Sequence, residues 1–314
     1  GGTGTLTLDG TTNDYTYVSA PINDVDLEGY LLLPAPAEPH AHLDKALTAD
    51  RLPNPKGDLH GAIDAWVASL PELNADEIAE RARRAVIELV AHGTTAIRTH
   101  VNVHPGLGIG AVEALVRVRD ELAELCDIQI VALVGNPLTG DGLGREYRAV
   151  FRDALLADRR VIAGGCPHHD PDPIEATEVC LREAIAFGRP IDLHTDETLH
   201  AEHLGLRYLA QRVREHDFDL GATASHCVSL AVQPLDVQHA VAAEVAAARV
   251  NVVTLPQTNL FLQGRDHPIG TPRGTNDIER LVDLVGRVSR QGDNICARAF
   301  QAAVGCVDTA RRSV

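Results

Sequence analysis

The chain has 314 residues, of which 45% are hydrophobic and 23% charged, and its formal net charge is −16. This balance predicts a folded protein with a large core, built either as two domains or as one α/β barrel. The acidic charge and the absence of a basic run argue against nucleic acid and anionic membrane surfaces as partners. The six scattered cysteines without a C-x-x-C pair fit a reducing compartment, and no signal-peptide pattern is seen, so we expect a cytoplasmic protein.

Residues 1–29 are rich in Thr, Gly and Asp and contain short alternating runs such as Thr5–Leu8. Such runs are typical of small β-strands, so this segment is predicted to form an accessory β-domain. The apolar run Tyr30–Leu33 then predicts a buried strand, followed by Pro39-His40-Ala41-His42. Because side chains i and i+2 of a strand point the same way, His40 and His42 can converge on one divalent metal ion just past its end.

From residue 30 onwards, strand-like and amphipathic helix-like segments alternate, which favours a (β/α)8 TIM-type barrel over residues 30–314. Asn74 is a predicted N-cap and Gly93 a predicted helix stop. After Tyr30–Leu33, the predicted strands are Thr95–Val103, Ile128–Val134, Arg160–Gly164, Pro190–His194, Ala222–His226, Val250–Thr254 and Gly286–Ser289. The predicted helices are Ala75–His92, Val112–Leu125, Arg145–Leu156, Ile174–Phe187, His200–His216, Leu235–Ala248 and Thr275–Val285.

Side chains that can bind a metal ion recur at the carboxyl ends of the predicted strands, which is the end of a TIM-type barrel where active sites lie. His100 lies near the end of the second strand, His194 ends the fifth, His226 ends the sixth, and Asp293 follows the eighth. The alternative for His226 is a buried histidine bonded to a backbone carbonyl. The alternative for Asp293 is ordinary turn chemistry, since it stands in Gly292-Asp293-Asn294.

His194 opens the segment His194-Thr195-Asp196-Glu197 and is a candidate third metal ligand. Glu197 could reach the same pocket without binding the metal, take a proton from an activated water and pass it to a leaving or ring nitrogen. The alternative is a core histidine followed by an acidic helix start. His168 follows the fourth strand, and it is either a pocket residue or a solvated loop residue.

The lysine content bears on the number of metal ions. The chain has only two lysines, Lys45 and Lys56, and both lie near the first predicted strand. A carbamylated lysine that bridges two metals on a mid-barrel strand therefore has no candidate, and one metal ion is the simplest expectation. A single ion held by three histidines and an aspartate leaves a coordination position for water, whose pKa the cation lowers toward neutrality.

With these residues assembled, the chain resembles the amidohydrolase superfamily and, within it, the cytosine deaminase-like branch. The likeness extends over roughly residues 25–295, and its segments occur in the family's order. The segments that carry it are Glu38–Lys45, Arg98–Val101, His194–Glu197, Ser225–His226, Asn259–Arg265, Pro272–Gly274 and Gly292–Asn294.

The resemblance implies one zinc or iron ion bound by His40, His42, His194 and Asp293. It also implies that Glu197 protonates a ring nitrogen, that His226 helps to activate the water and hold the tetrahedral intermediate, and that Asp293 accepts the water's proton. We therefore expect a hydrolase that acts on a carbon–nitrogen bond of a small cyclic amidine, by deamination of a pyrimidine-like ring. Release of an alkylamine from an N-alkyl triazine is the alternative within this class, and a non-catalytic heterocycle-binding barrel is the alternative outside it.

Three departures from the family pattern limit the choice of substrate. The Pro-Gln pair that reads the pyrimidine edge in cytosine deaminases is replaced by Gly135-Asn136-Pro137-Leu138. The Asp-Pro-aromatic run is replaced by Cys296–Phe300, and the family's closing strands have no counterpart before Val314. The expected partners are a small heterocycle and water, and the sequence is compatible with a homo-oligomer. The predicted substrate-binding residues are Asn136, His168, Gln263 and Asn294.

Overall fold

The computed structural model describes residues 2–8, 11–17, 35–55, 57–255, 258–259 and 262. The chain divides into two compact units, Gly1–Pro34 and Ala35–Val314. In the first unit, strand β1 (Gly2–Leu8) pairs antiparallel with strand β2 (Thr11–Tyr17). The alternating run Thr5–Leu8 lies in β1, as its pattern predicts.

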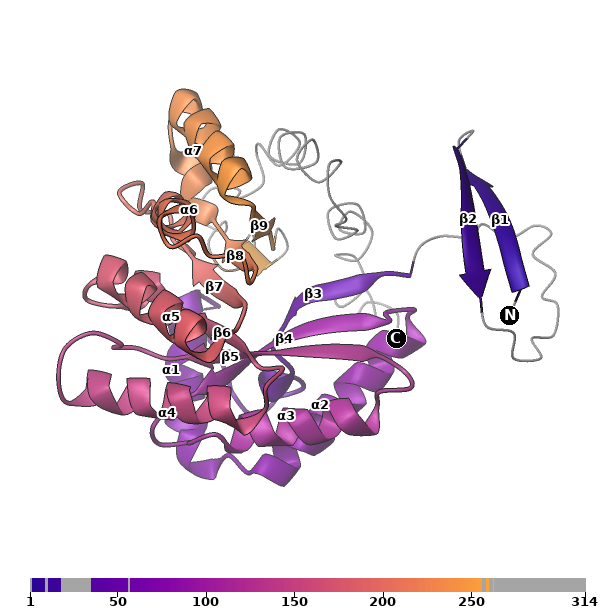
Figure 1. The fold of residues 1–314 in the computed structure, drawn as a ribbon. Helices are drawn as coiled ribbons and strands as arrows, with labels where there is room; N and C mark the ends of the chain where they lie inside the picture. The colour runs from indigo at the N-terminus through magenta and orange to yellow at the C-terminus, as the bar shows by residue number, and fades with distance from the viewer. Residues whose placement is uncertain are drawn as a thin grey trace. The chain divides into compact units, whose positions relative to one another are not determined.

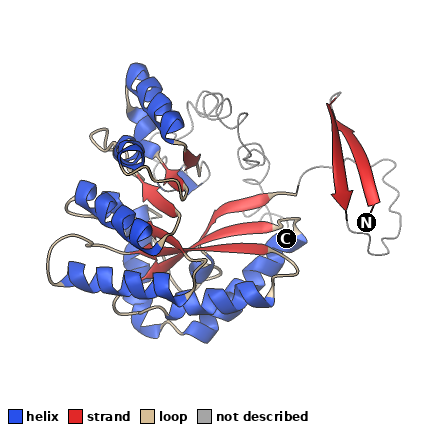
Figure 2. Ribbon diagram, in the orientation of Figure 1, coloured by secondary structure: helices blue, strands red, loops and turns tan. Residues whose placement is uncertain are grey.

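The second unit contains a seven-stranded parallel sheet whose strand order, β3 to β9, follows the chain order. Helices alternate with these strands and lie on the outer face of the curved sheet (Figures 1 and 2). This is the architecture of a TIM-type barrel. The strands are β3 (Ala37–Ala41), β4 (Ala96–Val103), β5 (Asp127–Val134), β6 (Ile162–Gly165), β7 (Ile191–Thr195), β8 (Ala222–His226) and β9 (Val250–Val253). The α-helices are α1 (Leu59–Ser69), α2 (Ala75–Ala91), α3 (Gly110–Glu121), α4 (Leu143–Ala157), α5 (Pro173–Phe187), α6 (Gly205–Glu215) and α7 (Leu235–Ala248).

The core lies between the strands and the apolar faces of these helices. Ile78 of α2, Leu115 of α3 and Phe151 of α4 are fully buried there, together with strand residues such as Ile130. Burying a side chain of this size removes it from water at a gain of about 1.5–3 kcal/mol. The helical periodicity of the sequence therefore corresponds to real contact faces on the sheet.

Local capping fixes the ends of helix α2. The Asn74 side chain accepts hydrogen bonds from the backbone N–H groups of Asp76 and Glu77, so the predicted N-cap is confirmed. The helix ends at Ala91, and Gly93 adopts φ +96, a conformation that glycine reaches without strain. This turn feeds the chain directly into strand β4.

The described structure differs from the predicted elements in three places. The first barrel strand is β3 (Ala37–Ala41), so His40 lies inside that strand, and Tyr30–Leu33 falls outside the described residues. Helix α1 was not predicted because it buries little, only Trp66 and Ser69. Helix α6 begins at Gly205 and not at His200, because Asp196 caps it from the preceding loop.

The predicted helix Thr275–Val285 and strand Gly286–Ser289 also lie outside the described residues. Among the helices that are described, none is both long and apolar enough to cross a membrane.

Gly164 in strand β6 is fixed by close packing. A Cβ atom at this position would overlap the Val131 side chain and lie 2.8 Å from the backbone oxygen of Asp192. We expect Gly164→Ala to lower the free energy of unfolding by about 1–3 kcal/mol, because the strand backbone cannot move aside. Urea denaturation measures this loss. Gly110→Ala is the control, since its Cβ would lie 3.8 Å from that of Ala75, and equal losses in both variants would contradict the packing argument.

Candidate active site

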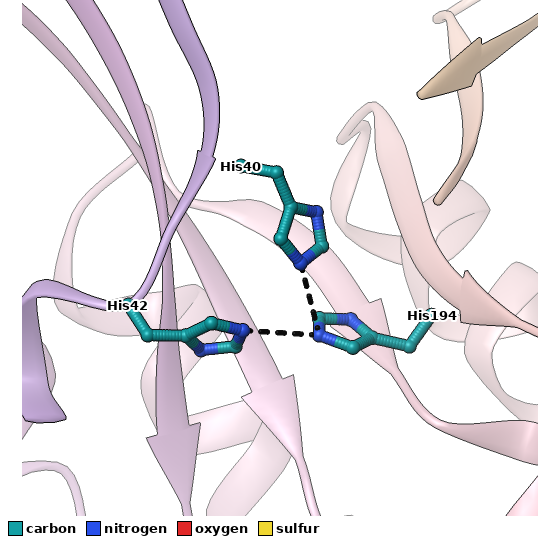
Figure 3. Close-up of side chains that lie close together, drawn as sticks. All are labelled: His40, His42 and His194. Atoms are coloured by element: carbon teal, nitrogen blue, oxygen red, sulfur yellow. Dashed lines mark hydrogen bonds between the residues drawn. The ribbon is translucent and has the colours of Figure 1, made fainter. Parts of the chain in front are cut away.

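Histidines from distant strands meet at the carboxyl ends of the sheet. His40 comes from β3, His42 directly follows β3, and His194 comes from β7. Strands β3 and β7 are separated by β4, β5 and β6, which in a flat sheet would place them about 19 Å apart. The curvature of the sheet instead brings the Nε2 atom of His194 to 3.2 Å from Nε2 of His40 and 3.2 Å from Nε2 of His42 (Figure 3).

The spacing of these nitrogens fits one metal ion. Two nitrogens bound tetrahedrally at the usual zinc–nitrogen distance of about 2.0–2.1 Å lie about 3.3 Å apart. His40, His42 and His194 form the one group among the described residues whose ligand atoms are close enough to hold an ion. The predicted fourth ligand, Asp293, lies outside the described residues.

The protonation of the cluster also suits a metal. Burial is the main cause that holds the pKa of His40, His42 and His194 well below the usual value of 6.5, and the Lys45 ammonium adds to it for His40 and His42. His42 Nδ1 lies 3.1 Å from the backbone oxygen of His100, which only accepts, and 3.3 Å from Lys45 Nζ, which only donates. The shorter contact favours the proton on His42 Nδ1, since Lys45 also donates to Asn102 Oδ1 at 2.6 Å. The Nε2 lone pair of His42 therefore faces the other two rings, and all three imidazoles are neutral.

Glu197 is a buried carboxylic acid beside this cluster. It is 7% exposed, and burial raises its pKa to about 8 from the usual 4.5. It lies in the loop between β7 and α6. The loop is held by Asp196, whose carboxylate accepts hydrogen bonds from the backbone N–H groups of Gly205 (3.0 Å) and Leu206 (2.9 Å).

His226, at the end of β8, contacts this acid. Its Nδ1 lies 3.2 Å from Oε1 of Glu197 and 3.2 Å from Nδ2 of Asn259, and its ring centroid is 4.9 Å from that of His194. Burial lowers the pKa of His226 to about 3. The residue adopts φ +72, which is rare for a non-glycine residue and marks a backbone held in place by its surroundings.

A charged network lies beneath the histidines. Asp192 accepts hydrogen bonds from Arg98 (2.8 Å) and Ser225 (3.1 Å), and burial raises its pKa to about 6. His100 is fully buried, with its Nε2 3.9 Å from Asp192 Oδ1 and its ring 4.0 Å from that of His40. His100 therefore packs under the cluster and supports the His40 ring.

The predicted substrate-binding residues Asn136 and His168 lie at neighbouring strand ends. Asn136 Nδ2 donates to the backbone oxygen of Cys166 at 3.0 Å, and His168 Nδ1 donates to the backbone oxygen of His194 at 3.1 Å. Asn136 Oδ1 and His168 Nε2 are buried and have no hydrogen-bond partner among the described residues. Both atoms are acceptors in this arrangement. Gln263 and Asn294 lie outside the described residues.

A pocket of about 420 Å³ adjoins the cluster, between the loops that precede α5 and α6. His168 and His194 both line it, and Thr177, Leu193 and Leu209 contribute to its walls. His194 is the one member of the cluster among the residues that line this pocket.

Sequence reasoning gave no role to Asn259 or Lys45. Asn259 belongs to the segment Asn259–Arg265, which carries part of the family resemblance. Its contact with His226, 33 residues earlier in the chain, could not be read from the sequence. Lys45 belongs to the 3₁₀ turn Leu43–Lys45, donates to Asn102 Oδ1 at 2.6 Å and lies 5.0 Å above the Trp66 ring. Both contacts join residues that are distant in the sequence.

The fold is a parallel α/β barrel, and its strand ends carry a cluster of neutral histidines and a buried carboxylic acid. These features are typical of barrel enzymes with a metal site at the strand ends. The chain belongs to the amidohydrolase superfamily, and its likeness to a 5-methylcytosine deaminase places it in the cytosine deaminase-like branch.

Three relatives carry this assignment. The chain is 34% identical over 257 residues to pterin deaminase from Rhizobium rhizogenes, which covers 81% of this chain and 57% of that protein. It is 28% identical over 219 residues to N-isopropylammelide isopropyl amidohydrolase from Pseudomonas sp. (strain ADP), covering 68% and 53%. The structure of 5-methylcytosine deaminase from Klebsiella pneumoniae with 5-fluorocytosine superposes with a TM-score of 0.76 at 27% identity, covering 90% of this chain and 69% of that one. The chain thus spans little more than half the length of the two curated relatives.

A family model described as outer membrane protein assembly factor BamB matches residues 237–314. This match covers less than half of the chain, and its described part includes most of helix α7 and strand β9 of the barrel. It does not define the family of the chain.

Proposed function

We propose that the protein is a metal-dependent hydrolase that removes an amino group from a cyclic amidine in a pyrimidine-like ring, alone or fused as in a pterin. The observation that carries the proposal is the buried Glu197, which lies 3.2 Å from His226 Nδ1, while the His226 ring lies 4.9 Å, centroid to centroid, from His194 of the cluster. The names of the relatives agree with it, since two of the three are deaminases of such rings.

We propose one zinc or iron ion in this cluster, bound by His40, His42, His194 and Asp293. Such an ion supplies a water whose pKa is lowered toward neutrality. Glu197 enters the reaction protonated at neutral pH and gives its proton to a ring nitrogen of the substrate, which makes the amidine carbon more electrophilic. The water oxygen adds to that carbon and the bond to the amino group breaks. Of the two protons that the water gives up, through Asp293 and Glu197, one leaves with the amino group as ammonia and the other restores the acid of Glu197.

The substrate edge is proposed to present N–H donors. Asn136 Oδ1 and His168 Nε2 are buried acceptors without a partner among the described residues, and leaving such atoms unpaired costs about 1–3 kcal/mol each. An amino-substituted ring with a neighbouring ring N–H offers the matching donors. An open-chain ester offers none.

The relative that acts on N-isopropylammelide supports a second candidate, release of an alkylamine from a triazine ring. Incubating the metal-loaded protein with pterin, cytosine, isocytosine and N-isopropylammelide, and quantifying ammonia and isopropylamine, separates the two. Ammonia from a pterin or a pyrimidine is the expected result. Isopropylamine alone would favour the second candidate, and no turnover of any ring would favour a heterocycle-binding barrel without catalysis.

His168 allows a test of substrate recognition. We expect His168→Phe to lower kcat/KM for the best ring substrate about 10- to 100-fold, because the substrate then loses one acceptor in a buried site. His169→Phe is the matched control, since His169 is the next residue of the same turn and is exposed. Steady-state ammonia release measures both. A loss in the His169 variant as large as that in the His168 variant would contradict the assignment.

A further inference from the structure

We propose that Asn259 is a positioning residue that keeps the ring proton of His226 on Nε2, and that it thereby reserves the proton of Glu197 for the substrate. The inference rests on the deaminase reaction proposed above for the role of Glu197. The arrangement of the three side chains is independent of that reaction.

The geometry joins Asn259 to both partners at once. Asn259 is 4% exposed, and its Nδ2 lies 3.2 Å from His226 Nδ1 and 3.5 Å from Glu197 Oε1. His226 Nδ1 and Glu197 Oε1 are themselves 3.2 Å apart. The backbone N–H of Asn259 donates to the oxygen of Leu255 at 2.9 Å, which anchors the residue after strand β9.

An amide nitrogen carries two hydrogens and can only donate. When Asn259 Nδ2 donates to His226 Nδ1, that ring nitrogen must be the acceptor, and the ring proton must reside on Nε2. The second amide hydrogen points to Glu197 Oε1 and is compatible with both the protonated and the ionised acid. The histidine tautomer is thus the same before and after Glu197 gives up its proton.

His226 Nε2 is buried and has no partner among the described residues, and the ring is 4.9 Å, centroid to centroid, from both His40 and His194. With its proton there, His226 offers a hydrogen-bond donor next to the reaction centre, suited to an oxygen that gains negative charge. Without Asn259, Nδ1 would pair with Glu197 instead. The acid would then share its proton with His226, and Nε2 would become a lone-pair acceptor.

Asn259→Asp tests which ring nitrogen of His226 carries the proton, and it hardly changes the shape of the side chain. A carboxylate at this position accepts a hydrogen bond from Nδ1–H and therefore favours the opposite tautomer. Long-range ¹⁵N–¹H correlation spectra of the metal-free protein report the tautomer directly, with His226 assigned by its loss in His226→Gln. We expect the Nε2–H form in the unsubstituted protein and the Nδ1–H form in Asn259→Asp. Asn251→Asp, which changes an exposed asparagine of β9, should leave the His226 signals unchanged.

The kinetic counterpart is a fall in kcat of about 100-fold or more in Asn259→Asp with KM changed by less than about 3-fold, since a wrong tautomer affects the transition state more than substrate binding. An Nδ1–H tautomer in the unsubstituted protein would overturn the proposal, whatever the substrate. If the tautomer changes as expected but no ring is deaminated, the positioning role stands and the proposed function falls.

Discussion

Replacing Glu197 by glutamine is expected to lower kcat about 1,000-fold, within the range of about 10²–10⁴ that a general acid–base group contributes. The amide keeps the shape of the side chain but cannot carry the proton that the ring nitrogen needs. The acid is 7% exposed, so water has little access to replace it. Steady-state ammonia release by the metal-loaded variant measures the loss.

Glu124→Gln is the control for this change, because Glu124 is an exposed carboxylate in the turn after helix α3. Its turnover should match that of the unsubstituted protein. Unchanged turnover in Glu197→Gln would show that Glu197 does not donate the proton to the ring nitrogen. The main support for a deaminase would then be lost.

The same substitution should change how the stability of the metal-free protein depends on pH. Glu197 has a folded-state pKa of about 8 against a usual value of 4.5, so between these pH values the folded state holds a proton that the unfolded state has lost. The free energy of unfolding therefore falls as the pH rises through this window, by on the order of 4 kcal/mol from this group. In Glu197→Gln this part of the slope should vanish, which urea titrations at pH 5 and about pH 8 can detect.

Replacing His194 by alanine is expected to have the other large effect, loss of the bound metal. His194 is the member of the cluster whose Nε2 lies 3.2 Å from both His40 and His42, so its removal leaves two nitrogens on one side of an open site. We expect metal content below about 0.1 equivalent and turnover reduced at least about 1,000-fold.

Metal analysis by mass spectrometry and a thermal shift with added zinc measure this prediction independently of turnover. The unsubstituted protein should be stabilised by the metal, because an ion that binds only the folded state raises the unfolding free energy, and His194→Ala should not be. His92→Ala provides the control, since His92 lies at the exposed end of helix α2. Full metal content in His194→Ala would place the ion elsewhere.

The fold could be predicted from the sequence to the extent that it depends on local patterns. Strand β8 (Ala222–His226) and helix α7 (Leu235–Ala248) have the bounds that their apolar periodicity indicates. Helix α1 was not predicted because an exposed helix has little apolar periodicity. The start of helix α6 was predicted at His200 and not at Gly205 because the capping by Asp196 joins residues nine and ten positions apart.

By itself, the sequence determined which chemistry is available: histidines and a carboxylic acid at the ends of strands, in an order that the amidohydrolase superfamily shares. Only the tertiary structure decided how these groups meet. Curvature of the sheet brings His40 and His194 together across three intervening strands, and the chain after β9 brings Asn259 to His226 and Glu197. The raised pKa of Glu197 has the same origin, because burial depends on side chains that the whole barrel packs around it and not on its neighbours in the sequence.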